Sequence, residues 1–278
     1  MLEALVMKKT FRFVAALMLL VCVLPCAFAR GNKESAEDNS LNELKARGQF
    51  ILGLDDSFPP MGFRNESNEI VGYDIDLAKE VCARLGVKLV VQPIDWAAKE
   101  QELNTGKIDC IWNGFTMTPE REKSLAFTKP YLDNAQVIVV RADSGIKTVA
   151  DLKGKKIGLQ AGSSAADALD AHPEIRQNVK QVIELKDNLT AFMDLETKGI
   201  DAVIIDMVVG NYNIKTSGKN FVVLSESLAS EKYGIGFRRN DKLLRDEVQR
   251  ILEEMAKDGT VAAISKKWFG SDISVIGK

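Results

Sequence analysis

The stretch DIDLAKEVCARLGVKLVVQP, residues 74–93, combines a helix pattern with a strand pattern that follows it directly. Acidic residues occupy the first turn of the helix pattern, Gly86 ends it, and VKLVVQP (87–93) predicts a strand. Apolar side chains recur at the spacing of one helix face: Ile75, Ala78, Cys82 and Leu85. A helix with a strand immediately after it indicates a βαβ unit and a largely parallel sheet.

The same alternation extends outward from this stretch. QFILGL (49–54) and KIDCIW (107–112) predict strands, and AAKEQELNTG (97–106) predicts a short helix before the second of them. A second series starts near residue 155 and reads strand, helix, strand, helix, strand: KKIGLQ (155–160), SSAADALDA (163–171), VKQVIEL (179–185), LTAFMDLETKG (189–199) and IDAVIID (200–206). Two such series predict an α/β protein with two lobes of roughly 90–120 residues each.

Further strands are predicted at QVIVV (136–140) and EKYGIGF (231–237), and the connectors 131–136 and 229–233 are candidate crossovers between the lobes. Residues 240–259 predict a long amphipathic helix. Its expected apolar face consists of Leu243, Leu244, Val248, Ile251, Leu252 and Met255.

The N-terminus has the pattern of an export signal. Basic residues precede a short apolar run at 13–24, and an Ala-x-Ala sequence ends at Ala29. We therefore expect residues 1–29 to be a signal peptide, with a flexible polar segment over 30–44. Lipid attachment at Cys26 or Cys22 is the alternative, although neither cysteine follows the small residue that such a signal requires.

Composition excludes several classes of function. A net charge of −2 gives no indication of nucleic-acid binding, and His172 is the only histidine. Without a Cys-x-x-Cys motif or a histidine cluster, we expect no metal site, no cofactor and no Ser-His-Asp triad. Export permits a disulfide between Cys82 and Cys110, but their apolar contexts favour two buried thiols.

Eight ordered motifs resemble the periplasmic amino-acid-binding proteins of ABC importers, solute-binding protein family 3, which include histidine-, glutamine- and lysine/arginine/ornithine-binding proteins. The resemblance extends from about Phe50 to Phe269. The motifs are DDSFPPMGF (55–63), GYDIDLAKE (72–80), GKIDCIWNGFTMTPERE (106–122), AFTKPY (126–131), DLKGKKIGLQAGSS (151–164), IDAVIID (200–206), YGIGF (233–237) and KKWFG (266–270).

The resemblance implies the type II periplasmic-binding-protein fold, in which two hinge strands join two α/β lobes and the ligand binds in the cleft between them. We expect residues 45–133 and 232–278 to form lobe 1, and residues 134–231 to form lobe 2. It also implies a periplasmic, monomeric protein that is not an enzyme. Its partners would be a free L-amino acid and an ABC importer permease.

The resemblance assigns the two charged ends of an amino acid to separate residues. Arg121 matches the arginine that binds the carboxylate, while Gly114 and Thr116 supply a backbone contact and a hydroxyl. Asp206 matches the acid that binds the ammonium group, although it could also cap the following helix. The second-lobe loop that would meet the carboxylate comprises Gly162, Ser163 and Ser164.

Asp55, Phe58 and Trp96 match positions that meet the side chain of the ligand, and Asn113 and Gln160 stand at site positions where the family usually carries other residues. The two aromatic rings could sandwich a side chain whose terminal charge Asp55 would meet. We therefore expect a basic L-amino acid such as arginine or lysine, with glutamine or cystine as the alternative. Asn113, Gln160 and Met61 depart from the usual pattern and leave the ligand open. A cyclohexadienyl-dehydratase type of enzyme on the same fold is a more distant alternative.

Overall fold

The computed structural model describes residues 37–278, so the expected signal peptide and the lipid-anchor cysteines lie outside the described residues. The chain divides into two units at Asp38, and everything below concerns Asp38–Lys278. No helix among the described residues is both long and apolar enough to span a membrane.

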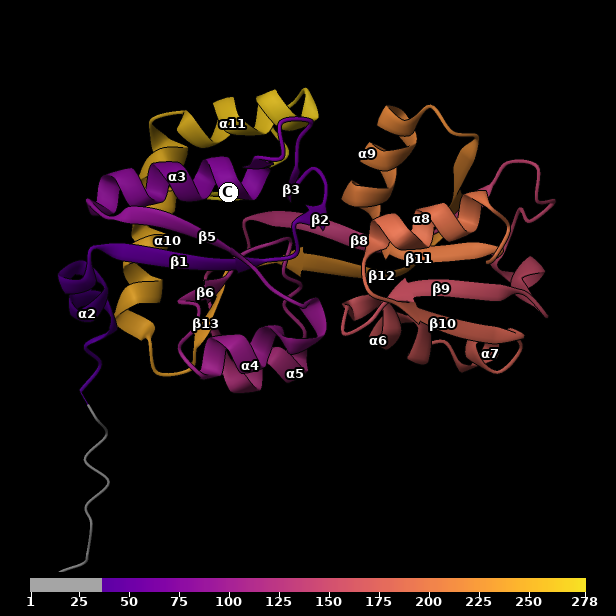
Figure 1. The fold of residues 1–278 in the computed structure, drawn as a ribbon, viewed down its shortest axis with the longest axis horizontal. Coiled ribbons are helices and arrows are strands. Elements are labelled where there is room, and N and C mark those ends of the chain that lie inside the picture. The colour runs from indigo at the N-terminus through magenta and orange to yellow at the C-terminus, as the bar shows by residue number, and fades with distance from the viewer. Residues whose placement is uncertain (1–36) are drawn as a thin grey trace, which may run out of the picture. The chain divides into compact units, whose positions relative to one another are not determined.

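The first lobe is built on a five-stranded sheet (Figure 1). Three adjacent strands on one side of this sheet run parallel to one another. The fourth strand, which comes last in the chain, runs antiparallel to the strand on each side of it. In spatial order the strands are β5 (Lys88–Pro93), β1 (Gln49–Leu54), β6 (Cys110–Ile111), β13 (Gly236–Arg238) and β7 (Leu125–Phe127). A small antiparallel sheet beside it comprises β2 (Ser57–Phe58), β3 (Gly62–Arg64) and β4 (Ile70–Val71).

Helices cover both faces of this first sheet (Figure 1). They are α2 (Ser40–Arg47), α3 (Tyr73–Leu85), α4 (Lys99–Asn104), α5 (Pro119–Ser124), α10 (Lys242–Lys257) and α11 (Thr260–Phe269), with a short 3-10 turn at Trp96–Ala98 before α4. The helix predicted at 74–86 is α3, and Gly86 ends it in the left-handed conformation. Helix α2 begins at Ser40, inside the segment expected to be flexible, because Leu44 packs into the core.

The second lobe repeats this plan with a second five-stranded sheet. In spatial order its strands are β10 (Gln181–Leu185), β9 (Lys156–Gln160), β11 (Ala202–Asp206), β8 (Leu132–Arg141) and β12 (Phe221–Tyr233). The first three are parallel, and β8 is antiparallel to both β11 and β12. Its helices are α6 (Ser164–Asp170), α7 (Pro173–Arg176), α8 (Asn188–Glu196) and α9 (Met207–Ser217), with a 3-10 turn at Val149–Leu152.

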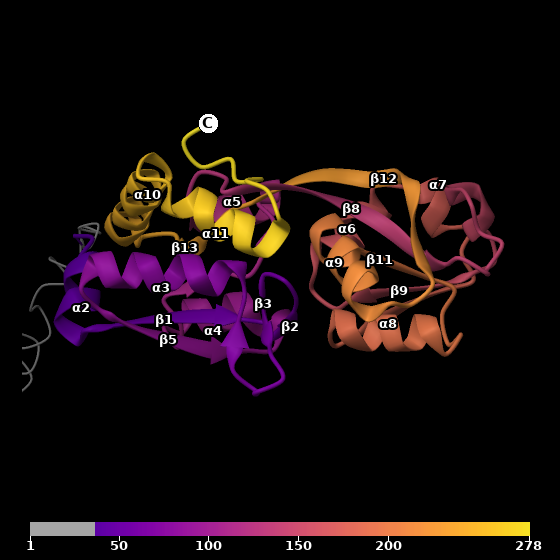
Figure 2. The ribbon, with the colours of Figure 1, turned by 90° about the horizontal axis from the view of Figure 1, so that it is seen from above.

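Strands β8 and β12 connect the two lobes. They pair antiparallel up to Leu132 and Tyr233, where the chain passes to the first lobe, and Figure 2 shows both strands extending toward it. The single strand predicted at 231–237 was wrong: β12 ends at Tyr233 and β13 begins at Gly236 in the other sheet. The chain changes sheets at this point, so the ladder cannot continue.

The apolar face predicted for residues 240–259 is largely confirmed, with one correction. Leu244, Val248, Ile251, Leu252 and Met255 of α10 are buried, but Leu243 is 48% exposed. One residue before Leu244 lies about 100° away around the helix, which places Leu243 beyond the buried stripe. Cys82 and Cys110 are buried and unpaired, which confirms the expectation of two thiols.

Candidate functional site

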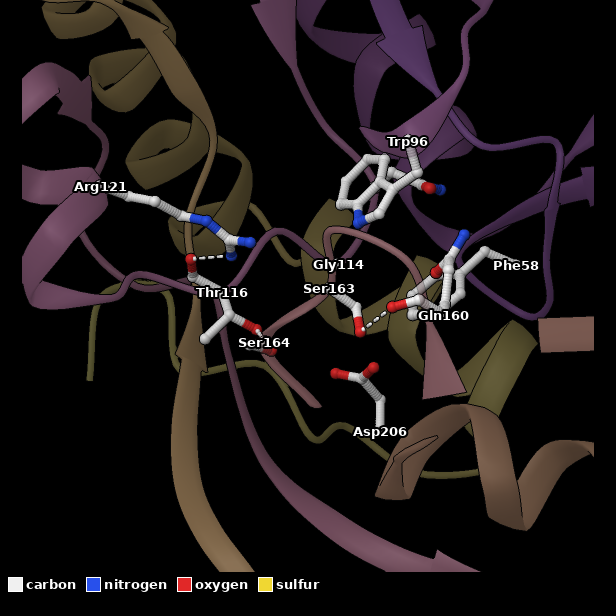
Figure 3. Close-up of a pocket in the computed structure, with 10 residues that line it drawn as sticks. Phe58, Trp96, Gly114, Thr116, Arg121, Gln160, Ser163, Ser164 and Asp206 are labelled. Carbon is white, nitrogen blue, oxygen red and sulfur yellow. Dashed lines mark hydrogen bonds between the residues drawn. The ribbon is translucent and has the colours of Figure 1, made fainter. Parts of the chain in front are cut away.

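A small cavity lies between the two lobes (Figure 3). About 280 Å³ of its space is not filled by protein atoms, a volume that includes open solvent. Every residue that lines it was singled out from the sequence: Phe58, Trp96, Asn113, Gly114, Thr116, Arg121, Gln160, Ser163, Ser164 and Asp206. The other two predicted residues, Asp55 and Gly162, contact members of this lining.

Arg121 places a buried cation at this cavity from the first lobe. It lies in the first turn of α5, where Thr118 caps the helix by accepting the Arg121 N–H at 3.2 Å. Its guanidinium donates to the Thr116 carbonyl at 2.9 Å and to the Gly162 carbonyl at 3.3 Å, and it stacks over Phe115. Burial lowers the pKa of Arg121, but an arginine keeps its charge in proteins.

Asp206 places a carboxylate at the same cavity from the second lobe. It is the last residue of β11 and occupies the cap position of α9, yet its side chain makes no capping hydrogen bond. Instead it accepts from Tyr233 Oη at 2.6 Å and from Asn134 Nδ2 at 2.7 Å. Burial, followed by the nearby charge of Glu231, raises the pKa of Asp206 to about 7. Asp206 therefore lines the cavity without capping α9 through its side chain.

The N–H of Gly114 is not free to meet a ligand, because it donates to Asp74 Oδ2 at 2.8 Å and to Tyr131 Oη at 3.1 Å. Its φ of 56° lies in the left-handed region that favours glycine. Asp74 and Tyr131 were not identified from the sequence, and their hydrogen bonds to the Gly114 N–H fix this turn.

Thr116 offers a lone pair rather than a hydrogen. Its hydroxyl donates to Glu231 Oε2 at 3.0 Å, and its oxygen accepts from Ser164 Oγ at 3.2 Å. Because an ionised carboxylate can only accept, the direction of the first bond is determined. The hydroxyl therefore faces a ligand as an acceptor, which suits an ammonium group better than a carboxylate.

The second-lobe loop approaches the cavity through Ser163 and Ser164. Ser163 caps α6 by accepting the Ala165 N–H at 3.3 Å and donates to the Gln160 carbonyl at 2.8 Å. Gly162 lies just outside the lining, and its carbonyl accepts from Arg121 and from Lys99 Nζ, the latter at 2.7 Å.

The predicted side-chain end of the site contains two buried aromatic residues, Phe58 and Trp96, and a polar cluster. Asp55 accepts from Gln160 Nε2 at 2.7 Å across the lobes and from the Ser57 N–H at 2.9 Å. Burial raises the pKa of Asp55 to about 6. Asn113 Oδ1 accepts the Asp55 N–H, and among the described residues its buried Nδ2 has no hydrogen-bond partner.

Sequence reasoning missed several polar residues around the cavity, notably Lys99, Asn134, Gln136 and Glu231. Lys99 is only 4% exposed, and its ammonium group also donates to the Trp96 carbonyl at 3.2 Å. Burial, and secondarily the charge of Arg121, lowers the pKa of Lys99 to about 8. One signal was available: Asn134 and Gln136 alternate along β8, which gives two amides on one face of a strand. No group of three His, Cys, Asp or Glu side chains within residues 37–278 could hold a metal ion.

Residues 50–271 match the family of bacterial extracellular solute-binding proteins, family 3, and the chain belongs to this family. The L-cystine-binding protein TcyJ of Escherichia coli K12 is 32% identical, over 87% of this chain and 90% of that relative. The solved structure of Tv2483 bound to L-arginine is 34% identical, with a TM-score of 0.84, over 87% of this chain and 99% of that one.

A third similar protein is an ABC uptake transporter substrate-binding protein from Streptococcus pneumoniae with bound histidine. It is 37% identical, with a TM-score of 0.83, over 86% of this chain and 98% of that chain. Similar proteins thus bind amino acids of different chemistry, and the family members are extracytoplasmic binding proteins. The chain is accordingly an amino-acid-binding protein of the ABC import class.

Proposed function

We propose that this protein captures a basic L-amino acid, such as arginine or lysine, by closing its lobes around it, and delivers it to an ABC importer permease. The observation that carries the proposal is the placement of Arg121 and Asp206. One is a buried cation on the first lobe and the other a buried carboxylate on the second, and both line one cavity. A free amino acid presents a carboxylate and an ammonium group on one carbon, which complements this pair.

The charges around the cavity favour a ligand with a net positive charge. Asp55, Asp206 and Glu231 are acidic, and so is Glu100, whose Oε1 lies 3.8 Å from Arg121 Nε; Arg121 and Lys99 are the basic groups, so full ionisation leaves an excess of negative charge. An unbalanced charge in a buried site is costly, and a ligand with one net positive charge would reduce the imbalance. Glutamine and cystine, which carry no net charge, remain the alternatives.

The aromatic residues support the same ligand class. The Trp96 and Phe58 side chains line the cavity on the side where Asp55 and Gln160 meet. An aliphatic stem that ends in a cation would pack against these rings, and stacking of a cation would add about 0.5–2 kcal/mol. Asp55 would then exchange its Gln160 amide partner for the terminal cation of the ligand.

Closure is the mechanism by which we expect capture to occur. Several hydrogen bonds already cross between the lobes: Gln160 to Asp55, Arg121 and Lys99 to the Gly162 carbonyl, and Ser164 to Thr116. A ligand that contacts Arg121 on one side and Asp206 on the other gains both contacts only in the closed state. Binding therefore shifts the population toward closure, with β8 and β12 as the hinge.

The proposal places the mature protein in the periplasm as a monomer, after cleavage behind Ala29 or with a lipid anchor at Cys26 or Cys22. It assigns no catalytic residue. Incubation with prephenate or arogenate tests the alternative of a dehydratase: we expect no product, and formation of product would contradict a purely binding role.

Calorimetric titration of the protein with each of the twenty amino acids and cystine tests the ligand. We expect the tightest binding for arginine or lysine, with a dissociation constant between about 10 nM and 1 µM, or roughly −11 to −8 kcal/mol. Tightest binding of a small apolar amino acid would contradict the proposed ligand class. If none of these compounds binds, the proposed function as a whole is contradicted.

A further inference from the structure

Glu231 is an acidic residue beside the cavity that neither the sequence motifs nor the cavity lining includes. It lies on β12 and pairs with Asn134 of β8, in the hinge between the lobes. One of its oxygens, Oε2, accepts three hydrogen bonds of 3.0 Å each, from Thr116 Oγ1, Asn134 Nδ2 and Gln136 Nε2. Three bonds to one oxygen hold this carboxylate in a single orientation.

Asn134 joins Glu231 to Asp206. Its Nδ2 donates to Asp206 Oδ1 at 2.7 Å and to Glu231 Oε2 at 3.0 Å, so both amide hydrogens are used. The two carboxylates are therefore linked through one amide, and a cation placed beside Asp206 also feels the charge of Glu231. The other ionisable groups facing Asp206 and Glu231 are Tyr233 on β12 and Arg121 on α5.

The orientation of the two hinge amides shows that the carboxylates determine this arrangement. Asn134 Oδ1 and Gln136 Oε1 are buried and have no hydrogen-bond partner among the described residues. A buried acceptor without a partner is unfavourable. The reverse orientation of either amide would point its oxygen at a carboxylate, which is worse. Both N–H groups are consequently held toward the acids.

The bond from Thr116 to Glu231 transmits this arrangement to the cavity. Glu231 takes the hydroxyl hydrogen, so Thr116 presents only a lone pair to a ligand. Ser164 Oγ donates to the hydroxyl oxygen of Thr116, and Gln136 Nε2 donates to Ser164 Oγ at 3.3 Å. Asp206 and Thr116 thus both offer acceptors to the same region of the cavity, and Glu231 sets the direction of the second.

We propose that Glu231 is a specificity-determining residue that makes the cavity select for a charged α-ammonium group, acting through Thr116 and Asn134. This inference rests on the proposed function and deepens it, because it states why an amino acid is preferred over the carboxylic acid that lacks its amino group. Glu231 is a positioning residue: it holds the acceptors and adds negative charge at the ammonium end of the ligand.

The test compares each amino acid with its desamino analogue in wild type and Glu231→Gln. The probe pairs are L-arginine with guanidinovaleric acid, and L-cystine with dithiodipropionic acid. Glu226→Gln is the matched control, since Glu226 is an exposed acid on the same strand. Glu231→Asp, which keeps the charge, tests rescue by a conservative change. Thr116→Val replaces Glu231→Gln if the latter does not fold.

In wild type we expect the amino acid to bind at least about 100-fold more tightly than its desamino analogue. In Glu231→Gln this ratio should fall by about 10- to 100-fold, the size expected for loss of a hydrogen bond to a charged group. The affinity for the desamino analogue should stay the same or increase. Glu226→Gln should keep the wild-type ratio, Glu231→Asp should restore most of it, and Thr116→Val should lower it.

An equal loss of affinity for both members of a pair in Glu231→Gln would indicate a merely structural role and would overturn this inference. A wild-type ratio in that variant would overturn it as well. Neither result affects the proposed function, which fails separately if the wild-type protein binds none of the amino acids in the titration panel.

Discussion

Replacement of Gly114 by alanine tests whether the turn at this residue shapes the cavity. Gly114 has a φ of 56°, and a Cβ added there would lie 2.9 Å from Cε1 of Phe58 and 3.0 Å from Cε2 of Tyr233. Gly106 is a matched control in the same lobe. Its φ is 75°, but a Cβ there meets nothing within 4 Å, so it isolates backbone strain from steric conflict.

The expected magnitudes differ between these two glycines. The left-handed conformation destabilises the folded state by about 1–2 kcal/mol when alanine replaces glycine. Alanine also lowers the entropy of the unfolded chain, which stabilises the folded state by about 0.4–1 kcal/mol. Gly106→Ala should therefore lower the free energy of unfolding by about 1 kcal/mol. Gly114→Ala must also displace buried rings, which adds about 1–3 kcal/mol and gives a total of about 2–4 kcal/mol.

Ligand binding should separate the two variants further. Phe58 lines the cavity, and Tyr233 donates to Asp206, so displacing these rings disturbs both the side-chain end and the ammonium end of the site. We expect Gly114→Ala to bind L-arginine at least about tenfold more weakly, an affinity change of about 1.4 kcal/mol or more, and Gly106→Ala to bind it normally. Equilibrium urea denaturation and calorimetric titration measure the two effects. If Gly114→Ala and Gly106→Ala have the same free energy of unfolding and the same affinity for L-arginine, the argument from close packing at Gly114 is refuted.

Three further predictions concern the charges of the site. Arg121→Lys should weaken amino-acid binding by about 100-fold in calorimetry, because a single ammonium group cannot make the two parallel bonds of a guanidinium; unchanged affinity would argue against bidentate capture. Asp55→Asn should weaken L-arginine binding by about tenfold and leave L-glutamine binding nearly unchanged, and equal losses for both would show that Asp55 does not read the terminal charge. Affinity for L-arginine should rise from pH 5 to pH 8. Burial raises the pKa of Asp55 to about 6 and the pKa of Asp206 to about 7, and a cationic ligand requires both carboxylates to be ionised. The bound protein therefore holds fewer protons than the free protein, so binding strengthens as the pH rises. Titrations across this range should show an increase of about tenfold or more, and a flat profile would contradict the assignment of these acids to the ligand.

Local patterns in the sequence predicted the two α/β series, whereas the family resemblance supplied the residues of the cavity lining. Helical spacing and capping residues predicted α3, and alternating strands and helices predicted both parallel sheets. The motifs around Arg121 and Asp206 placed polar residues at strand ends, where the carboxyl edge of a parallel sheet forms a crevice. Those residues line one cavity because both sheets turn the same edge toward it.

Other features depend on contacts that local pattern cannot reveal. Residues 231–237 alternate like one strand, and only the passage between lobes divides them into β12 and β13. Lys99 lies in a helix pattern as an ordinary polar residue, yet it is buried and donates to the Gly162 carbonyl of the second lobe. The hydroxyl of Thr116 became an acceptor because Glu231, 115 residues further along the chain, takes its hydrogen.

A crystal structure of the protein with the amino acid that it binds most tightly tests the central claim most directly. We expect one ligand in the cavity, with its carboxylate on the guanidinium of Arg121 and its ammonium group on Asp206 and Thr116. An amino acid bound with its carboxylate away from Arg121, or with its ammonium group away from Asp206, would contradict the account.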